Sequence, residues 1–467
     1  MKKTGKILSA LILTVEFCAL FILMPHLTDS RLRNAFFTPQ RAFAVIVTGI
    51  LGFFSFLYIN IFPRLTVRKT STRRNQILED GAALLQLFLV TVTTESAFVI
   101  LYLLYRFSGP SNEPCSFSEG AGFLIGLLLL ILAESVLFWN GILRVYTTSV
   151  QLGLKWRVIG IICGFIPIVH IWVLCRIIGI ASREADFENE KHLLDQVRAH
   201  SQICQTKYPL LLVHGVFFRD FRFFNYWGRI PHALKQNGAV IYYGNQQSAA
   251  SVAACGQELA ERIRTIVRET GCEKVNIVAH SKGGLDSRHA ISACGVSHLV
   301  ATLTTINTPH RGCIFADYLL ERIPERIQKS VARKYNAALK RFGDTDPDFF
   351  SAVRDLTASA CALRNEKLPD HPDVYYQSVG SKMNCASSGR FPLNMAYPLV
   401  RHFDGANDGL VSMESARWGE SFTPLATPEG RGISHGDMID LNRENIPGFD
   451  AREFYVNLVA DLKKKGF

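Results

Sequence analysis

One serine in the second half of the chain lies between small residues at a predicted strand-to-helix turn. The segment VNIVAHSKGG (275–284) ends an apolar run at Ser281, with Ala279 two positions before and Gly283 two positions after. Such a turn is crowded, so small flanking residues allow a strained backbone that points the serine oxygen outward. The amino terminus of the next helix would then face the site and favour developing negative charge. Ser281 is the candidate nucleophile.

A serine needs a base and an orienting acid to become nucleophilic. Asp408, in FDGANDGLVS, precedes a glycine and a short apolar run, as expected for an acid on a loop after a strand. His435, in GISHGDMID, lies in a loop of glycine and serine near the end of the chain. The order Ser281, Asp408, His435 is the order of α/β-hydrolase triads. Asp404 remains the alternative acid.

An oxyanion formed at this serine would need backbone N–H donors. We expect one from Lys282, the residue after the serine, and one from Val216, which follows His214-Gly215 at the end of the first predicted strand. The Lys282 ammonium could also meet an anionic head group.

For several other polar and aromatic residues, a structural role must be weighed against a functional one. His214 and His280 are expected to line the site or pack beneath it, and His310 to be structural. The aromatic segment 217–227 could form an acyl-chain wall or pack beside the oxyanion loop. Three aspartates could bind a metal, but solvated turn carboxylates are the favoured reading: Asp344, Asp346 and Asp348.

Alternating strands and helices must position these residues. Predicted strands cover 208–215, 238–244, 274–280, 299–309 and 373–381, and predicted helices cover 251–270 and 284–294. This alternation predicts an α/β fold with a mainly parallel sheet and helices on both faces. Residues 311–370 interrupt the rhythm with a mostly helical insertion, which is a candidate lid.

Five motifs in order make the second half resemble the bacterial true lipases of the α/β-hydrolase superfamily. They are LLVHGVFF, VNIVAHSKGGLDSRHA, LTTINTPHRGCIFADYL, NDGLVS and SHGDMIDLN, within about residues 207–467. Position 279 is Ala where the GxSxG pattern has Gly. The resemblance implies an α/β-hydrolase fold and hydrolysis of water-insoluble acyl esters.

Related lipases often hold a structural calcium near the catalytic histidine. Asp437 matches one such ligand, but the partner aspartate expected before Asp408 is missing from SKMNCASSGRF (381–391). No cofactor is therefore expected, and Asp437 is the one candidate calcium ligand.

The first 183 residues are predicted to form an all-α membrane region with five spans. Five apolar stretches are long enough to cross a bilayer: 7–27, 43–62, 82–105, 122–143 and 158–180. A polar helical connector is expected over 184–206, followed by the hydrolase domain over 207–467. We found no family resemblance in the membrane half.

The basic residues predict how these spans are oriented. Residues 1–183 carry 17 Lys+Arg and 8 Asp+Glu, whereas the rest of the chain carries 34 and 32, so the net positive charge lies mainly beside the spans. This distribution disfavours nucleic-acid binding, which needs a basic face on a folded domain. Alternate loops hold eleven and four cations, which places the amino terminus in the cytoplasm. Five crossings would then place the hydrolase domain outside it.

The predicted spans contain ionisable residues, among them Glu16, Glu95, Glu134 and His170. Such residues are functional candidates because they are costly in hydrocarbon. Hydrogen bonding between helices by protonated carboxyls is the simpler reading. The sequence assigns them no task.

The sequence thus predicts a membrane-anchored serine hydrolase that cleaves carboxylic esters of lipids. Its expected partners are the lipid ester and the bilayer. Two alternatives remain open: an acyltransferase or a glycolipid or phospholipid deacylase of the same fold, and a non-catalytic membrane sensor or scaffold that only binds lipid.

Overall fold

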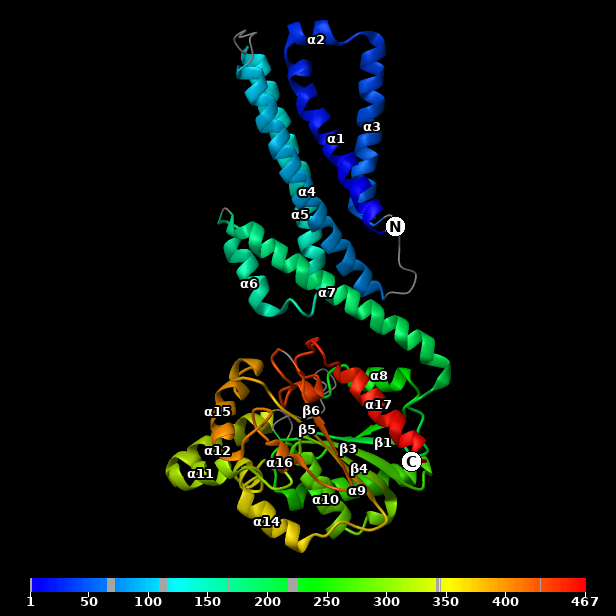
Figure 1. The fold of residues 1–467 in the computed structure, drawn as a ribbon, viewed down its shortest axis with the longest axis vertical. Helices are drawn as coiled ribbons and strands as arrows, with labels where there is room; N and C mark the ends of the chain where they lie inside the picture. Colours follow the sequence, from blue (N-terminus) through cyan, green and yellow to red (C-terminus); the bar gives the residue numbers. More distant parts are fainter. Residues whose placement is uncertain are drawn as a thin grey trace. The chain divides into compact units, whose positions relative to one another are not determined.

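The computed structural model describes residues 2–64, 72–108, 116–166, 168–216, 226–341, 344, 346–428 and 430–467. It divides into two compact units, Met1–Leu194 and Asp195–Phe467. Figure 1 shows the helices of the first unit and the mixed helices and strands of the second.

The first unit is entirely helical over its described residues. Its helices are α1 (Lys2–Thr28), α2 (Ser30–Phe36), α3 (Pro39–Ile61), α4 (Arg73–Ser108), α5 (Phe117–Thr148), α6 (Gly153–Cys163) and α7 (Val169–Arg198), the last of which continues into the second unit. Four helical segments in the described part of the chain are long and apolar enough to cross a membrane: Ile7–Thr28, Pro39–Ile61, Arg73–Arg106 and Phe117–Thr148. The first four predicted spans correspond to these segments.

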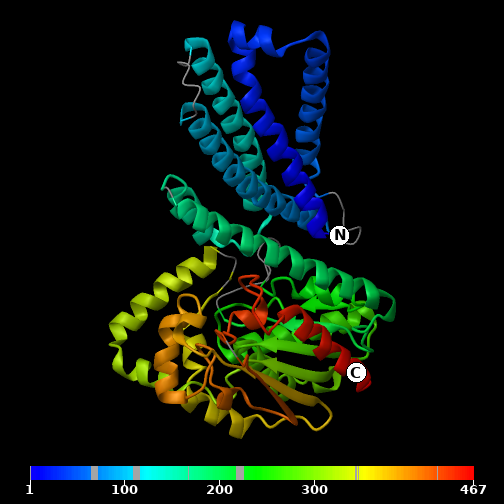
Figure 2. The ribbon, with the colours of Figure 1, turned by 45° about the horizontal axis from the view of Figure 1, so that its top comes forward.

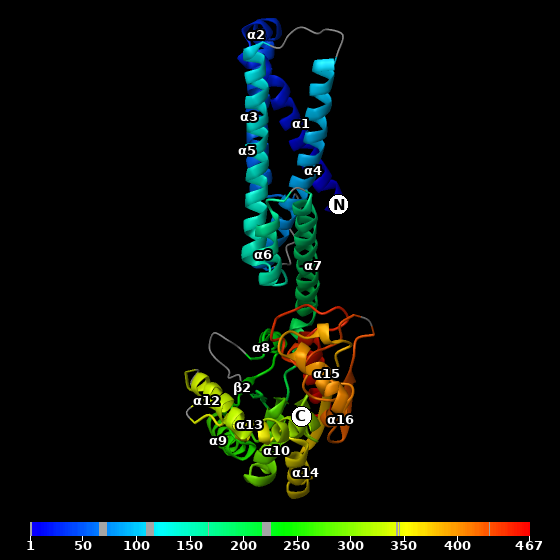
Figure 3. The ribbon, with the colours of Figure 1, turned by 90° about the vertical axis from the view of Figure 1, so that its left-hand side faces the viewer.

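The fifth predicted span is not a single helix among the described residues, so a fifth crossing stays a prediction. Its residues are divided between α6, which ends at Cys163, and α7, which begins at Val169 (Figure 3). Ile168 adopts a positive φ of 68°, which no helical residue has. Each helix is too short or too polar to qualify as a span. The apolar run was long enough, but the turn within it interrupts the helix.

Helices α4 and α5 pack closely because glycines face each other where they cross. A Cβ on Gly81 would lie 2.9 Å from the carbonyl oxygen of Gly141, and a Cβ on Gly141 would lie 3.1 Å from that of Gly81. Small residues of this kind let helix backbones approach one another. This contact fixes the pair of helices that carries Glu95 and Glu134.

The second unit is built on a six-stranded parallel sheet. The strands are β1 (Leu210–Val213), β2 (Ile241–Tyr243), β3 (Val275–His280), β4 (Val300–Ile306), β5 (Tyr375–Ser381) and β6 (Ser421–Leu425), in the order β2-β1-β3-β4-β5-β6. All neighbouring pairs are parallel. The five predicted strands are confirmed. The sixth, an edge strand that contains Pro424, was missed because it has no buried apolar run.

Helices cover both faces of this sheet, as the α/β pattern predicted. Alternate strand residues point to opposite faces. On one face Leu210, Leu212 and Val278 pack with α8 (Ile230–Gln236) and α17 (Ala451–Lys464). On the other face, Leu211 and Ile277 pack with α9 (Val252–Thr270) and α10 (Lys282–Ala293).

The predicted 311–370 insertion consists of four helices over its described residues. They are α11 (Ile314–Arg322), α12 (Glu325–Arg341), α13 (Phe349–Arg354) and α14 (Ala358–Lys367). Figure 2 shows the yellow-green α12 on the outside of the second unit. Two further helices, α15 (Leu393–Asp404) and α16 (Met413–Ala416), flank the loop that carries Asp408.

Candidate active site

Ser281 lies at the sharp turn between β3 and α10, where the sequence predicted it. Its backbone has φ 56° and ψ −133°, a conformation that L residues rarely adopt. The Ser281 N–H donates to the Ile306 carbonyl at 2.9 Å, and its carbonyl accepts from the Thr308 hydroxyl at 2.8 Å. These two hydrogen bonds, to the last residue of β4 and to the loop that follows it, hold the strained residue in place. Its side chain is nearly buried, with 7% of the residue exposed.

The segment that follows β1 lies directly against this turn, so each of the two segments requires a glycine. A Cβ on Gly283 would lie 2.4 Å from the His214 carbonyl oxygen. A Cβ on Gly215 would lie 2.8 Å from the Cβ of Ser281. Real Cβ atoms do not approach so closely, so neither glycine can be replaced without movement of the backbone.

Asp408 and His435 meet, although 27 residues separate them. Nδ1 of His435 lies 2.6 Å from Oδ2 of Asp408, and the His435 N–H donates to the Asp408 carbonyl at 2.9 Å. Because a carboxylate only accepts, this contact assigns the proton to Nδ1 and leaves Nε2 of a neutral ring as an acceptor. That tautomer is the one a general base needs.

The Asp408 carboxylate is fully buried and every contact on it is a donor. Oδ1 accepts from the N–H groups of Leu410 (2.9 Å) and Val411 (2.7 Å). Oδ2 accepts from Nδ2 of Asn307 at 2.6 Å, in addition to His435. Asn307 is a site residue that the sequence reasoning missed. The available signal was a polar residue directly after β4, at the carboxyl edge of the sheet.

The ring of His435 also lies close to the residue before the serine. Its centroid is 4.5 Å from that of His280. Nδ1 of His280 is 2.7 Å from the Tyr226 hydroxyl, which accepts from the Gly215 N–H at 3.0 Å. Burial lowers the pKa of His280 well below its usual value, with a further contribution from the charge of His435. A neutral His280 therefore packs beneath His435, as expected from its position.

The two predicted oxyanion donors have different surroundings. Lys282 is the first residue of α10, so its N–H has no acceptor within the helix. Its side chain is buried, and Nζ donates to Asp286 at 2.6 Å and to the Cys255 sulfur at 3.4 Å. The alternative in which this ammonium meets an anionic head group is therefore wrong. Val216 is half-buried and ends the described part of its loop.

The aromatic segment falls largely outside the described residues. Residues 217–225 are not among them, so the acyl-wall reading stays a prediction. Tyr226 and Trp227 are both buried and belong to the core on one face of the sheet.

The rival residues have structural contacts of their own. Asp404 lies at the end of α15 and accepts from the N–H groups of Ile314 (3.2 Å) and Phe315 (3.4 Å), which caps α11. His214 is buried between the carbonyls of Gly215 and Gln246.

Neither metal reading fits the side chains present. Oδ2 of Asp437 accepts from the N–H and hydroxyl of Ser434, and Oδ1 accepts from Arg431 at 2.9 Å. The guanidinium of Arg431 thus lies where a calcium ion would have to bind Asp437, and such a position does not fit a calcium site. Asp344 accepts from Ser248. Among the described residues, no group of three or more His, Cys, Asp or Glu side chains could hold a metal.

Comparison with known proteins supports the predicted resemblance for the second unit. Residues 235–334 match a family described as "Putative serine esterase (DUF676)". A triacylglycerol lipase of Pseudarthrobacter phenanthrenivorans is 35% identical over 177 residues, which cover 35% of this chain and 54% of the relative. One of Burkholderia plantarii is also 35% identical over 177 residues, 35% of this chain and 49% of the relative. The chain thus spans about half the length of these curated relatives.

Solved structures of lipases also align with this chain. The mature Bacillus licheniformis lipase BlEst2 is 22% identical, with a TM-score of 0.41 over 54% of this chain and 92% of that one. The Staphylococcus hyicus lipase is 17% identical, with a TM-score of 0.42 over 56% of this chain and 97% of that one.

Proposed function

We propose that this protein is a membrane-associated serine hydrolase that cleaves carboxylic esters of lipids. The observation that carries the proposal is the buried bond between Asp408 and His435, whose ring lies 4.5 Å from that of His280, the residue before the strained Ser281. The curated relatives, which are named triacylglycerol lipases, support an ester as the substrate.

In the proposed mechanism Ser281 attacks the ester carbonyl while Nε2 of His435 takes its proton. Asp408 holds the ring in the tautomer that leaves Nε2 free and stabilises the imidazolium that forms. The N–H groups of Lys282 and Val216 hold the oxyanion. The tetrahedral intermediate then expels the alcohol, which receives the proton from His435. Water, activated by His435 in the same way, releases the acid and restores the serine.

The membrane unit supports a lipid as the substrate. Four apolar helices would anchor the chain in a bilayer, where water-insoluble esters are concentrated. The helices of residues 311–370 would act as a lid over the site, in line with the predicted insertion.

The number of spans changes the side of the membrane on which the hydrolase unit lies. The predicted loop charges place the amino terminus in the cytoplasm. Four crossings then return the chain to that side, whereas five would not. Ten free cysteines in the described residues fit a reducing compartment. We therefore propose a cytoplasmic hydrolase unit, in place of the extracytoplasmic one that the five-span prediction required.

A fluorophosphonate probe and a p-nitrophenyl ester test the catalytic assignment. The Ser281→Ala variant should lose labelling and on the order of 10⁶-fold in kcat, because it removes the nucleophile. Ser292→Ala, on the same helix, is the matched control, because the Ser292 hydroxyl donates to the Pro369 carbonyl at 2.9 Å. Undiminished hydrolysis by Ser281→Ala, or a wild-type protein that neither reacts with the probe nor cleaves esters, would refute the proposal. Product analysis with added alcohols separates hydrolysis from acyl transfer.

A further inference from the structure

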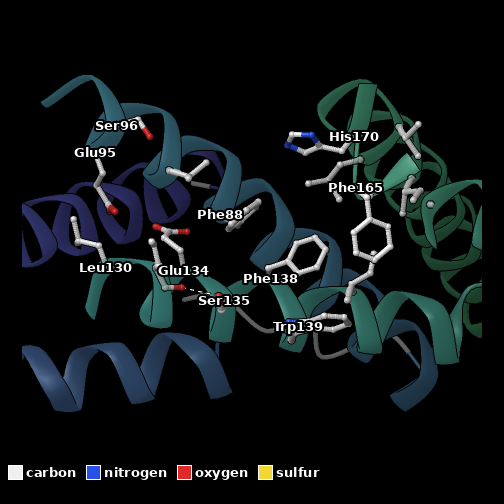
Figure 4. Close-up of a pocket in the computed structure, with 18 of the residues that line it drawn as sticks. Phe88, Glu95, Ser96, Leu130, Glu134, Ser135, Phe138, Trp139, Phe165 and His170 are labelled. Carbon is white, nitrogen blue, oxygen red and sulfur yellow. Dashed lines mark hydrogen bonds between the residues drawn. The ribbon is translucent and has the colours of Figure 1, made fainter. Parts of the chain in front are cut away.

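The membrane unit contains a cavity of about 800 Å³ among α4, α5, α6 and α7. Its walls are mainly hydrocarbon and aromatic side chains. Figure 4 shows Phe88 and Phe138 along the wall, between Glu95 and Glu134 at one end and His170 at the other. The volume falls within the range of about 300–1,000 Å³ that is usual for small-ligand sites.

The two carboxyl groups have unused hydrogen-bonding capacity. Glu95 is 3% and Glu134 is 6% exposed, and each lies more than three turns from either end of its helix. Among the described residues, Oε1 of Glu95 and both carboxyl oxygens of Glu134 have no hydrogen-bond partner. Buried polar atoms are rarely left in this state, because each unpaired group keeps its full desolvation cost. The two carboxyls lie close enough to interact with each other, as expected for bonding between helices, but one mutual contact leaves most of their donor and acceptor capacity for a further group.

The cavity opens on side chains that face hydrocarbon in a membrane. Three of its lining residues are Ile100, Trp139 and Leu143, and all three are largely exposed on the surface of the apolar helices. A ligand would therefore enter from the bilayer, and the aromatic wall would contact its chain.

The two glutamate carboxyl groups at one end of the cavity indicate which polar group the ligand must carry. Uncharged carboxylic acids both donate and accept, and hydrocarbon surroundings disfavour their ionised form. A hydroxyl group matches such a pair, because it also donates and accepts. A lipid phosphodiester is charged and has no donor on its phosphate, and a quaternary ammonium has no N–H to donate.

We propose that this cavity binds one uncharged lipid with a single hydrocarbon chain and a hydroxylated head group, of the monoglyceride type. The chain lies along Phe88 and Phe138, and the hydroxyls bond to Glu95 and Glu134. Its walls come from the first unit alone, so the site does not depend on the function proposed for the second.

Photolabelling of the full-length protein in phosphatidylcholine nanodiscs tests this site. The probe is a monoalkylglycerol with a photoreactive, alkyne-tagged chain, whose ether bond an esterase does not cleave. Phosphatidylcholine and fatty-acid probes with the same tagged chain serve as comparisons. The monoalkylglycerol should label peptides of α4 or α5, and unlabelled monoalkylglycerol should compete.

Variants of Glu95 and Glu134 distinguish the binding of a hydroxylated ligand from the binding of a cation. Replacing both by leucine removes the hydrogen bonds and should raise the half-saturating probe concentration at least tenfold. Replacing both by glutamine keeps uncharged donors and acceptors, so labelling should stay within about threefold of wild type. Glu16→Leu is the matched control, since Glu16 also lies in a span but does not line the cavity.

A further variant controls for the case in which the double leucine variant of Glu95 and Glu134 does not fold. Val92→Trp fills the cavity while both carboxyls remain, and it should also weaken labelling. Each variant is compared by its elution profile and melting temperature. Equal labelling of these peptides by the phosphatidylcholine or fatty-acid probe, or unchanged labelling of the leucine pair, would overturn the proposal. So would loss of labelling in the glutamine pair, since it would show a need for charge and hence a cation site.

Discussion

Among the described residues, the Asp408 carboxylate contacts only hydrogen-bond donors. One of these donors is His435, so Asp408 rather than Asp404 is the acid that can orient its ring. Two backbone N–H groups and the Asn307 amide bind the carboxylate in addition to the imidazole. Asp404, four residues earlier, instead binds backbone N–H groups at the start of α11. The two aspartates are alike in the sequence and differ only in what surrounds them.

Exchange of each aspartate for asparagine distinguishes these roles. Asp408→Asn keeps the shape but removes the charge and presents a donor, which favours the wrong imidazole tautomer, so kcat should fall about 10⁴-fold. Asp404→Asn should change kcat only slightly, since an asparagine oxygen can still cap α11. Steady-state hydrolysis of a soluble p-nitrophenyl ester measures both. Equal losses in the two variants would remove Asp408 from its proposed role.

His310 is expected to make folding sensitive to acid. Burial lowers its pKa well below the usual value, with Arg288 and Arg311 adding to the effect. Below about pH 6.5 the unfolded chain binds a proton at this residue and the folded chain does not. The free energy of unfolding should therefore decrease as the pH falls below 6.5, by up to about 1.4 kcal/mol per pH unit for this group.

His310→Gln measures this contribution. The variant removes one titrating group, so its stability should depend less steeply on pH between 7.5 and 5.5 than that of wild type. Denaturant unfolding at several pH values gives the slopes. Identical slopes would show that His310 is protonated in the folded protein as easily as in the unfolded one.

At the scale of elements, the turn between β3 and α10 depends on its glycines. In Gly283→Ala the new Cβ would overlap the His214 carbonyl, which belongs to the backbone and cannot rotate away. We expect a loss of about 3 kcal/mol or more in unfolding free energy, together with loss of fluorophosphonate labelling. Gly179→Ala, whose Cβ would make only an ordinary contact at 3.8 Å, should be tolerated. A stable and fully active Gly283→Ala variant would contradict the close packing of this turn.

In the proposed lid, helix α12 exposes apolar side chains that an insoluble substrate would contact. Ile327 and Val331 lie one turn apart and are 53% and 39% exposed. Ile327→Ser with Val331→Ser should lower activity on an emulsified long-chain ester several-fold, because less apolar surface is available for contact. Activity on a short soluble ester should not change.

The exposed cations of the same helix provide the control for this prediction. Lys329→Ser with Arg333→Ser removes two exposed cations, and the surface ion pair of Lys329 with Glu325 contributes little to stability. Equal effects on both substrates in the apolar variant would argue against α12 as a lid.

At the scale of the whole molecule, the number of crossings determines where hydrolysis takes place. Four spans predict that both chain ends lie in the cytoplasm. Green fluorescent protein fused after Phe467 should fluoresce, and alkaline phosphatase fused there should be inactive. Fusions made after Phe37, between the first two spans, should give the opposite pattern. Active phosphatase at the carboxyl terminus would instead restore an odd number of crossings.

The sequence alone determined the features that depend on neighbouring residues. The apolar runs of β1 and β3, the small residues around Ser281 and the long apolar helices follow from local pattern, because backbone geometry and burial act over a few residues. These patterns were sufficient to predict the parallel sheet and its lipase-like resemblance. A sheet edge without an apolar run, β6, had no such signal.

Only the tertiary structure decided which distant residues meet. Asn307 meets Asp408 across 101 residues, and His435 meets the same carboxylate across 27. Each outcome depends on partners brought together by chain folding, and hydrogen bonds and ion pairs act only at contact distance. The spacing of residues along the chain therefore could not determine them.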